Sequence, residues 1–182
     1  PDAFTTNKNN ATYVAYLFAG GESTAATARS VKYNGGSLVV NNHSDLDIGS
    51  GDFTIEFWFK PLSSSDHHSL IALSKYGSNV SGEISLQIYE HDRGHKIFIM
   101  DGSSYTDVSH QSKTFGYGSW SHFAWTRSGS GSNNNKIFIN GSLVDQFSNN
   151  FSPDNGQSWI IGANDWGQDG TPNQYTFDGN IS

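Results

Sequence analysis

Residues 53–60 constrain the fold most, because apolar and polar side chains alternate along them. Every second position is apolar, namely Phe53, Ile55, Phe57 and Phe59, and the positions between hold Thr54, Glu56, Trp58 and Lys60. A repeat of two predicts a β-strand, since successive side chains point to opposite faces of a sheet. Glycines precede the stretch and Pro61 follows it, as expected at strand ends. A strand this aromatic is predicted to lie in the middle of a sheet.

Other stretches repeat this signal at short intervals and no run favours a helix. The sequence predicts strands at 13–19, 30–33, 37–40, 69–75, 83–90, 95–100, 120–127, 136–145 and 159–162. Asn140-Gly141 inside 136–145 is typical of a type I′ hairpin turn, and 128–135 reads as a flexible polar loop. The prediction is an all-β protein, an antiparallel jelly-roll β-sandwich. Four aromatic side chains are predicted to be largely buried: Phe57, Trp58, Phe123 and Trp125.

Composition excludes several kinds of partner. The net charge is −7 and the ten basic residues are scattered, which argues against a nucleic-acid partner. The longest apolar run, 13–19, is too short to cross a bilayer, so no membrane insertion is predicted. There is no cysteine, so neither disulfides nor thiol chemistry are available. The chain begins at Pro1 without Met, which indicates a piece of a longer protein.

The order of the motifs resembles a known family. The segments 51–58, 120–127, 137–141, 161–162 and 177–181 together resemble a laminin-G-like domain of the concanavalin A-like lectin/glucanase superfamily. The resemblance implies a jelly-roll domain over 30–182 that lacks its last strand, preceded by an N-terminal strand and joining segment over 1–29. The missing strand would leave a sheet edge that a neighbouring segment or subunit covers. Residues 12–24 resemble joining segments in structural proteins of marine tailed phages.

Enzymatic chemistry finds little support in the sequence. Glucanases of this superfamily carry an acid-x-Asp-x-acid pattern on one strand, but Asp52, Thr54 and Glu56 have threonine at the centre. His91 and His95 flank a turn and His67-His68 are adjacent, without spacing that implies a third zinc ligand, so surface turn residues are favoured. No Gly-x-Ser-x-Gly stands between a strand and a helix. A non-catalytic domain is therefore predicted.

The loop 162–178 is the candidate binding site. Its acids Asp165, Asp169 and Asp178 supply the hard oxygen ligands that calcium prefers, so calcium is the one candidate cofactor. A glycan could pack on Trp166 and Tyr175 and hydrogen-bond to Asn164 and Asn173. The alternative is that Asn, Asp and Gly simply build a long turn and that Trp166 caps the sandwich.

Together these features favour a non-catalytic attachment or decoration domain on the surface of a tailed-phage particle, in a tail fibre or on the capsid. Its expected partners are other virion subunits, with which it would be oligomeric, and a glycan of the host surface. Two alternatives stay open: a carbohydrate-binding module of a secreted bacterial protein, and an architectural spacer that binds nothing.

Overall fold

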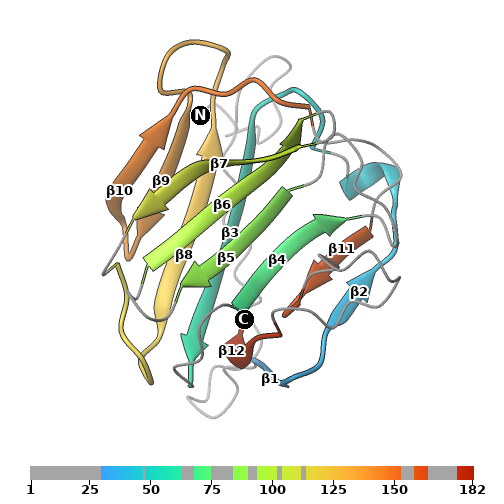
Figure 1. Ribbon diagram of the computed structural model, residues 1–182, viewed down its shortest axis with the longest axis vertical. Helices are drawn as coiled ribbons and strands as arrows, with labels where there is room; N and C mark the ends of the chain where they lie inside the picture. The colour runs from blue at the N-terminus through green and yellow to red at the C-terminus, as the bar shows by residue number, and fades with distance from the viewer. Residues whose placement is uncertain are drawn as a thin grey trace, which may run out of the picture.

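The protein is a two-layered β-sandwich (Figure 1). The computed structural model describes residues 30–46, 48–62, 68–74, 84–89, 94–101, 104–111, 114–152, 158–163 and 176–182. Within these ranges twelve strands form two six-stranded sheets in which neighbouring strands are antiparallel. One short 3-10 turn, η1 (Ser44–Leu46), is the only helical element of the same ranges. No helix in these ranges is long and apolar enough to cross a membrane.

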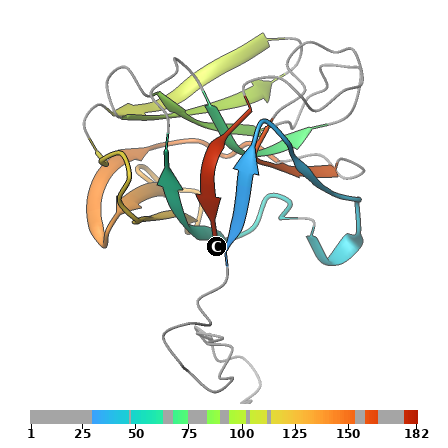
Figure 2. The ribbon, with the colours of Figure 1, turned by 90° about the horizontal axis from the view of Figure 1, so that it is seen from below.

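Both sheets are built from strands that are distant in sequence. The first sheet has the order β1 (Val31–Asn34), β12 (Asp178–Ile181), β3 (Phe53–Pro61), β8 (Ser121–Arg127), β9 (Asn135–Ile139), β10 (Ser142–Phe147). The second has the order β2 (Leu38–Val40), β11 (Ser158–Ile161), β4 (His68–Ser74), β5 (Ile84–Tyr89), β6 (Gly94–Asp101), β7 (Ser104–Gln111). Figure 2 shows the sheets as two layers, with β1 and β12 side by side. The predicted all-β jelly-roll sandwich is confirmed.

Strand β3 lies inside the first sheet, as its alternation predicts. On one side it pairs with β8, from Phe53↔Arg127 to Phe59↔Ser121. On the other side its last residues, Phe59–Pro61, pair with β12. Phe53 and Phe59 are buried, and Phe57 packs partly buried against the core. The prediction that Trp58 is buried is wrong, since its side chain is 49% exposed. Trp58 occupies an even position of the strand, and the alternation that turns the phenylalanines inward turns it outward.

Aromatic rings of β3 and β8 pack against one another in the core. Trp125 contacts Phe53 edge-on at 5.1 Å between ring centroids, and Phe123 stacks on Phe57 at 5.3 Å. The burial predicted for Phe123 and Trp125 is confirmed. The largest fully buried side chains are Trp125, Phe59, Phe123, Phe177, Ile84, Ile97, Ile99 and Ile137.

The β9–β10 turn forms where the local sequence predicts it, whereas strand β7 was not predicted. The β9–β10 hairpin turns at Asn140 and Gly141, whose φ angles of 51° and 78° are those that a type I′ turn needs. The short turn between β1 and β2 joins the two sheets, since β1 belongs to the first sheet and β2 to the second. Strand β7 at the edge of the second sheet was not predicted, because its sequence SYTDVSHQ is mostly polar.

Strand β12 covers only part of β3. Their pairing runs over Phe59–Pro61, and the backbones of Trp58 and Ser182 exchange two hydrogen bonds of 2.9 Å. Within the described residues, the part of β3 before Trp58 is paired on its β8 side alone. That a further strand or a neighbouring subunit covers this stretch stays a prediction. The N-terminal strand expected at 13–19 lies outside the described residues.

Gly162, which follows β11, has no room for a side chain. Its φ is 85°, and a Cβ added there would collide with the ring of Tyr33. We expect Gly162→Ala to lower the free energy of unfolding by about 2–4 kcal/mol, from backbone strain and overpacking. Urea denaturation would measure this. In the control Gly131→Ala the new Cβ meets no atom within 4 Å, and equal losses in both variants would contradict the expectation.

Candidate functional site

A buried arginine organises the rim at the end of β8. The Arg127 side chain is 2% exposed and donates four hydrogen bonds to three backbone carbonyls, those of Gly49, Gly51 and Phe151, at 2.6–2.8 Å. The rings of Phe53 and Phe151 lie 4.7 and 5.2 Å from its guanidinium carbon. Burial lowers the pKa of Arg127, and the charge of Asp52 acts in the opposite direction. One side chain thus ties together the segment before β3 and the segment after β10.

Two buried asparagines hold the adjoining loop between β8 and β9. The Asn134 side chain donates to the carbonyl of Gly129, the carbonyl of Asn149 and Oδ1 of Asn150 at 2.8–3.1 Å. Asn135 is fully buried, donates to the Asn149 carbonyl and accepts a bond from the Trp125 indole. The predicted polar loop is present over 128–134, but Asn134 and Asn135 are buried and form a hydrogen-bonded base beneath it, as buried amides require.

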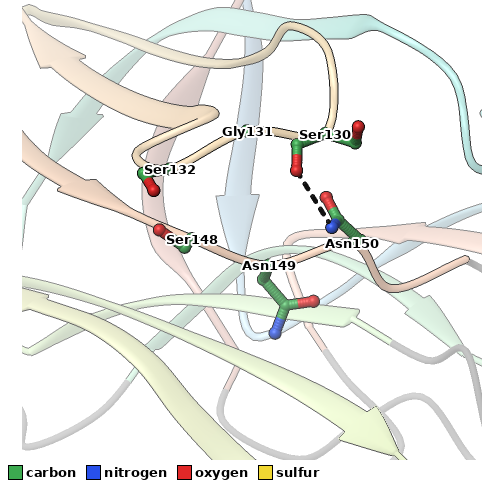
Figure 3. Close-up of a pocket in the computed structure, with 6 residues that line it drawn as sticks. All are labelled: Ser130, Gly131, Ser132, Ser148, Asn149 and Asn150. Carbon is green, nitrogen blue, oxygen red and sulfur yellow. Dashed lines mark hydrogen bonds between the residues drawn. The ribbon is translucent and has the colours of Figure 1, made fainter.

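A hollow of about 490 Å³ opens on this base. We call it the rim pocket, and Figure 3 shows its lining: Ser130, Gly131 and Ser132 from the β8–β9 loop, with Ser148, Asn149 and Asn150 from the segment after β10. The Ser132 and Ser148 hydroxyls turn toward one another. Asn150 joins the two walls by a 3.2 Å bond from its side chain to the Ser130 carbonyl.

The lining of the rim pocket offers hydrogen-bonding groups without charge. Ser148 Oγ accepts the backbone N–H of Asn133 at 2.8 Å and keeps its own proton to donate. The Ser130 and Ser132 hydroxyls add two more groups that both donate and accept. Asn149 Oδ1 accepts the Phe151 N–H at 2.7 Å, which fixes the amide. Such neutral groups on a fixed backbone suit a hydroxylated, uncharged ligand.

The sequence-predicted loop site lies mostly beyond what the structure describes. Asn164, Asp165, Trp166, Asp169, Asn173 and Tyr175 are outside the described residues. Asp178 is the first residue of β12, pairs with Asn34 and is half-buried. In the part of the chain that the structure covers, no three His, Cys, Asp or Glu side chains gather as a metal site would need. The calcium and glycan assignments for this loop stay predictions.

The glucanase-like triplet is spread over two environments. Asp52 precedes β3 and accepts the Gly129 N–H at 2.7 Å, so it helps to hold the β8–β9 loop. Thr54 and Glu56 lie on the outward face of β3, and Glu56 Oε2 is 3.7 Å from Nε2 of His122.

A histidine, a serine and an aspartate do meet inside the sandwich. His95 Nε2 lies 3.0 Å from Ser109 Oγ, and Ser109 donates to Asp145 Oδ2 at 2.6 Å. Ser109 is buried and stands between the other two, so its hydroxyl proton goes to Asp145, on the opposite sheet. The trio joins β6 and β7 to β10. The prediction that His95 is a surface turn residue is wrong, because it falls on the inward alternation of β6 with Ile97 and Ile99.

Sequence reasoning missed the rim pocket. Its walls come from two separate segments, residues 130–132 and 148–150. Its support, Arg127, bonds to carbonyls 76 and 78 residues away. One signal was present: Asn133–Asn135 and Asn149–Asn150 are two asparagine runs at the two ends of the predicted hairpin 136–145. Strands paired in a hairpin bring such ends together.

Comparison with known proteins agrees with this architecture. The carbohydrate-binding module CBM40 of Ruminococcus gnavus IT-sialidase, bound to alpha2,3 sialyllactose, has a TM-score of 0.59 and 17% identity over 80% of this chain and 85% of its own. NanB sialidase of Streptococcus pneumoniae (K499G mutant) has a TM-score of 0.67 and 18% identity over 84% of this chain, which spans 24% of that enzyme. Mouse laminin alpha1 domains LG4-5 have a TM-score of 0.59 and 17% identity, covering 84% of this chain and 39% of theirs.

These likenesses, all below 25% identity, concern the fold. No curated protein matches the chain by sequence. A family model described as the concanavalin A-like lectin/glucanases superfamily matches residues 32–182, which include all twelve strands except the first residue of β1. The chain therefore belongs to the concanavalin A-like lectin/glucanase superfamily.

Proposed function

We propose that this domain binds carbohydrate without catalysis and that the rim pocket is a contact site. The observation that carries the proposal is the lining of the pocket, made of hydroxyl and amide groups on a base of buried, bonded asparagines. Sugars present many hydroxyls, and groups held in place lose little freedom when they bind. A module of this fold has been solved with sialyllactose, which shows that such a sandwich can carry a glycan.

We propose that the ligand is uncharged. The lining residues carry no basic side chain, and the guanidinium of Arg127 is already engaged by three carbonyls. The net charge of −7 would also repel an acidic polymer. A neutral glycan needs no counter-charge, so this pocket suits it better than a sialylated one.

Blocking the rim pocket should abolish this binding. A Cβ added at Gly131 meets no atom within 4 Å, so Gly131→Trp should place an indole at the pocket wall. We expect the labelled wild-type domain to bind neutral glycans on a glycan array and the variant to lose at least about tenfold in affinity. Gly36→Trp, also at a glycine with open surroundings, is the matched control and should bind normally. Equal binding by all three proteins would contradict a rim-pocket contact.

For the biological setting we propose an attachment domain on the surface of a tailed-phage particle, supported by the resemblance of residues 12–24 to phage joining segments. Immunogold labelling of intact purified particles with an antibody against the domain tests this. Detection only in the secreted fraction of uninfected bacteria would favour the alternative, a carbohydrate-binding module of a secreted bacterial protein.

Calcium in the 162–178 loop is a separate proposal, and calorimetric titration of wild type and Asp165→Ala tests it.

A further inference from the structure

Two indole side chains lie exposed on the outer face of the first sheet, away from the rim pocket. Trp58 on β3 is 49% exposed and Trp120, just before β8, is 42% exposed. Trp58 pairs with His122, and Trp120 lies two residues before His122, so both indoles fall on the alternation that points away from the buried Phe59 and Ser121. Side chains of paired strands at such positions share one face. We call Trp58, Trp120 and their polar neighbours Glu56, Lys60 and His122 the aromatic platform.

His122 holds Trp58 in place. The two rings lie 5.1 Å apart at 54°, and His122 Nε2 is 3.7 Å from Glu56 Oε2. The His122 backbone is fixed in turn, because its N–H donates to Asn140 Oδ1 at 2.8 Å and its carbonyl accepts the Asn140 N–H at 2.9 Å. Trp58 is thus supported on one side while about half of it stays open to solvent. A supported, open indole needs little reordering to receive a ligand.

The polar surroundings decide what kind of ligand fits. Asn180 on β12 is the pairing partner of Lys60, so the indoles are bordered by an amide, an ammonium, a carboxylate and an imidazole. A stable protein interface buries about 800 Å² on each partner around an apolar centre, whereas the rest of this β3 face is polar, with Thr54, Glu56 and Lys60. A pyranose ring matches better, because its C–H face packs on an indole while its hydroxyls reach the groups around it.

We propose that the aromatic platform is a second carbohydrate contact, specific for a neutral pyranose polysaccharide. The proposal rests on the proposed carbohydrate-binding function and extends it to a separate surface. His122 and Arg127 are five residues apart on β8, so the platform and the rim lie roughly 17 Å apart along the strand. A polymer that engages both contacts gains affinity because the second contact forms within the same complex.

Affinity electrophoresis in native gels tests the platform. The gels contain a β-glucan, a galactomannan, a dextran or no polysaccharide, and a further gel contains alginate as an acidic counterpart. We expect wild type to be retarded by at least one neutral polymer and Trp58→Ala to lose about tenfold or more in apparent affinity. Leu143→Ala, which removes another side chain that is 49% exposed, is the matched control and should migrate like wild type. Melting temperatures of all variants establish that they are folded, and Trp58→Phe should retain part of the retardation.

The outcomes separate this proposal from the rim pocket. Loss of retardation in both Trp58→Ala and Gly131→Trp supports the platform and the rim pocket together. Loss in Trp58→Ala but not in Gly131→Trp supports the platform and refutes the rim-pocket contact. The reverse pattern overturns the platform and leaves the rim pocket in place. Undiminished retardation of Trp58→Ala, retardation by alginate alone, or no retardation of wild type in any gel each overturns the platform.

Discussion

Replacing Arg127 with alanine is expected to lower the free energy of unfolding by about 3–5 kcal/mol. The substitution removes four hydrogen bonds from a charged donor and leaves the carbonyls of Gly49, Gly51 and Phe151 without it. It also removes the cation between two aromatic rings. The rim pocket should lose its shape as well, because Phe151 directly follows the pocket wall.

Guanidinium denaturation of the variant measures this loss. Arg127→Lys should fall between alanine and wild type, since a single ammonium keeps the charge but cannot bond three carbonyls in the same geometry. Lys136→Ala, at an exposed position of the neighbouring strand β9, is the control and should change stability by less than about 0.5 kcal/mol. An Arg127→Ala protein as stable as the Lys136→Ala protein would show that the arginine network does not hold the rim.

Replacing Trp125 with alanine is expected to cost about 3–5 kcal/mol. Its side chain is 1% exposed and contacts Phe53, Phe147 and Phe151, and its indole N–H donates to Asn135 at 3.1 Å. The substitution therefore opens a cavity in the core and also leaves a buried amide oxygen without its donor.

The contrast with Trp58 makes this prediction specific. Trp58→Ala removes a side chain of the same type that is half-exposed, so we expect it to cost less than about 1 kcal/mol. Thermal unfolding of the two variants under one set of conditions compares them. Equal losses would contradict the assignment of one tryptophan to the core and the other to the surface.

Local sequence patterns predict the parts of this fold that depend on local physics. The alternation in 53–60 identifies a central strand, and Asn140-Gly141 identifies the hairpin turn, because positive φ angles require such residues. The burial of Trp58 was mispredicted because aromatic character was weighted above the alternation that places it outward. Strand β7 was missed because an edge strand can be polar on both faces.

The rim pocket depends on contacts that no local pattern contains. Arg127 ends a predicted strand, where a surface-exposed charge is the ordinary expectation, yet it is buried because three carbonyls from distant segments surround it. Asn134 and Asn135 look like residues of a flexible turn until the segment after β10 supplies their partners. Polar residues that become buried through long-range pairing cannot be told from solvated ones by composition.

Binding of neutral carbohydrate at the rim pocket can be tested by NMR titration of the isotope-labelled domain. Soluble hydrolysates of a β-glucan, a galactomannan and a dextran are the probes. We expect that at least one of the three produces saturable amide shifts at the residues that line the pocket: Ser130, Gly131, Ser132, Ser148, Asn149 and Asn150. Spectra that stay unchanged with all three, or shifts confined to residues outside the rim pocket, would contradict it.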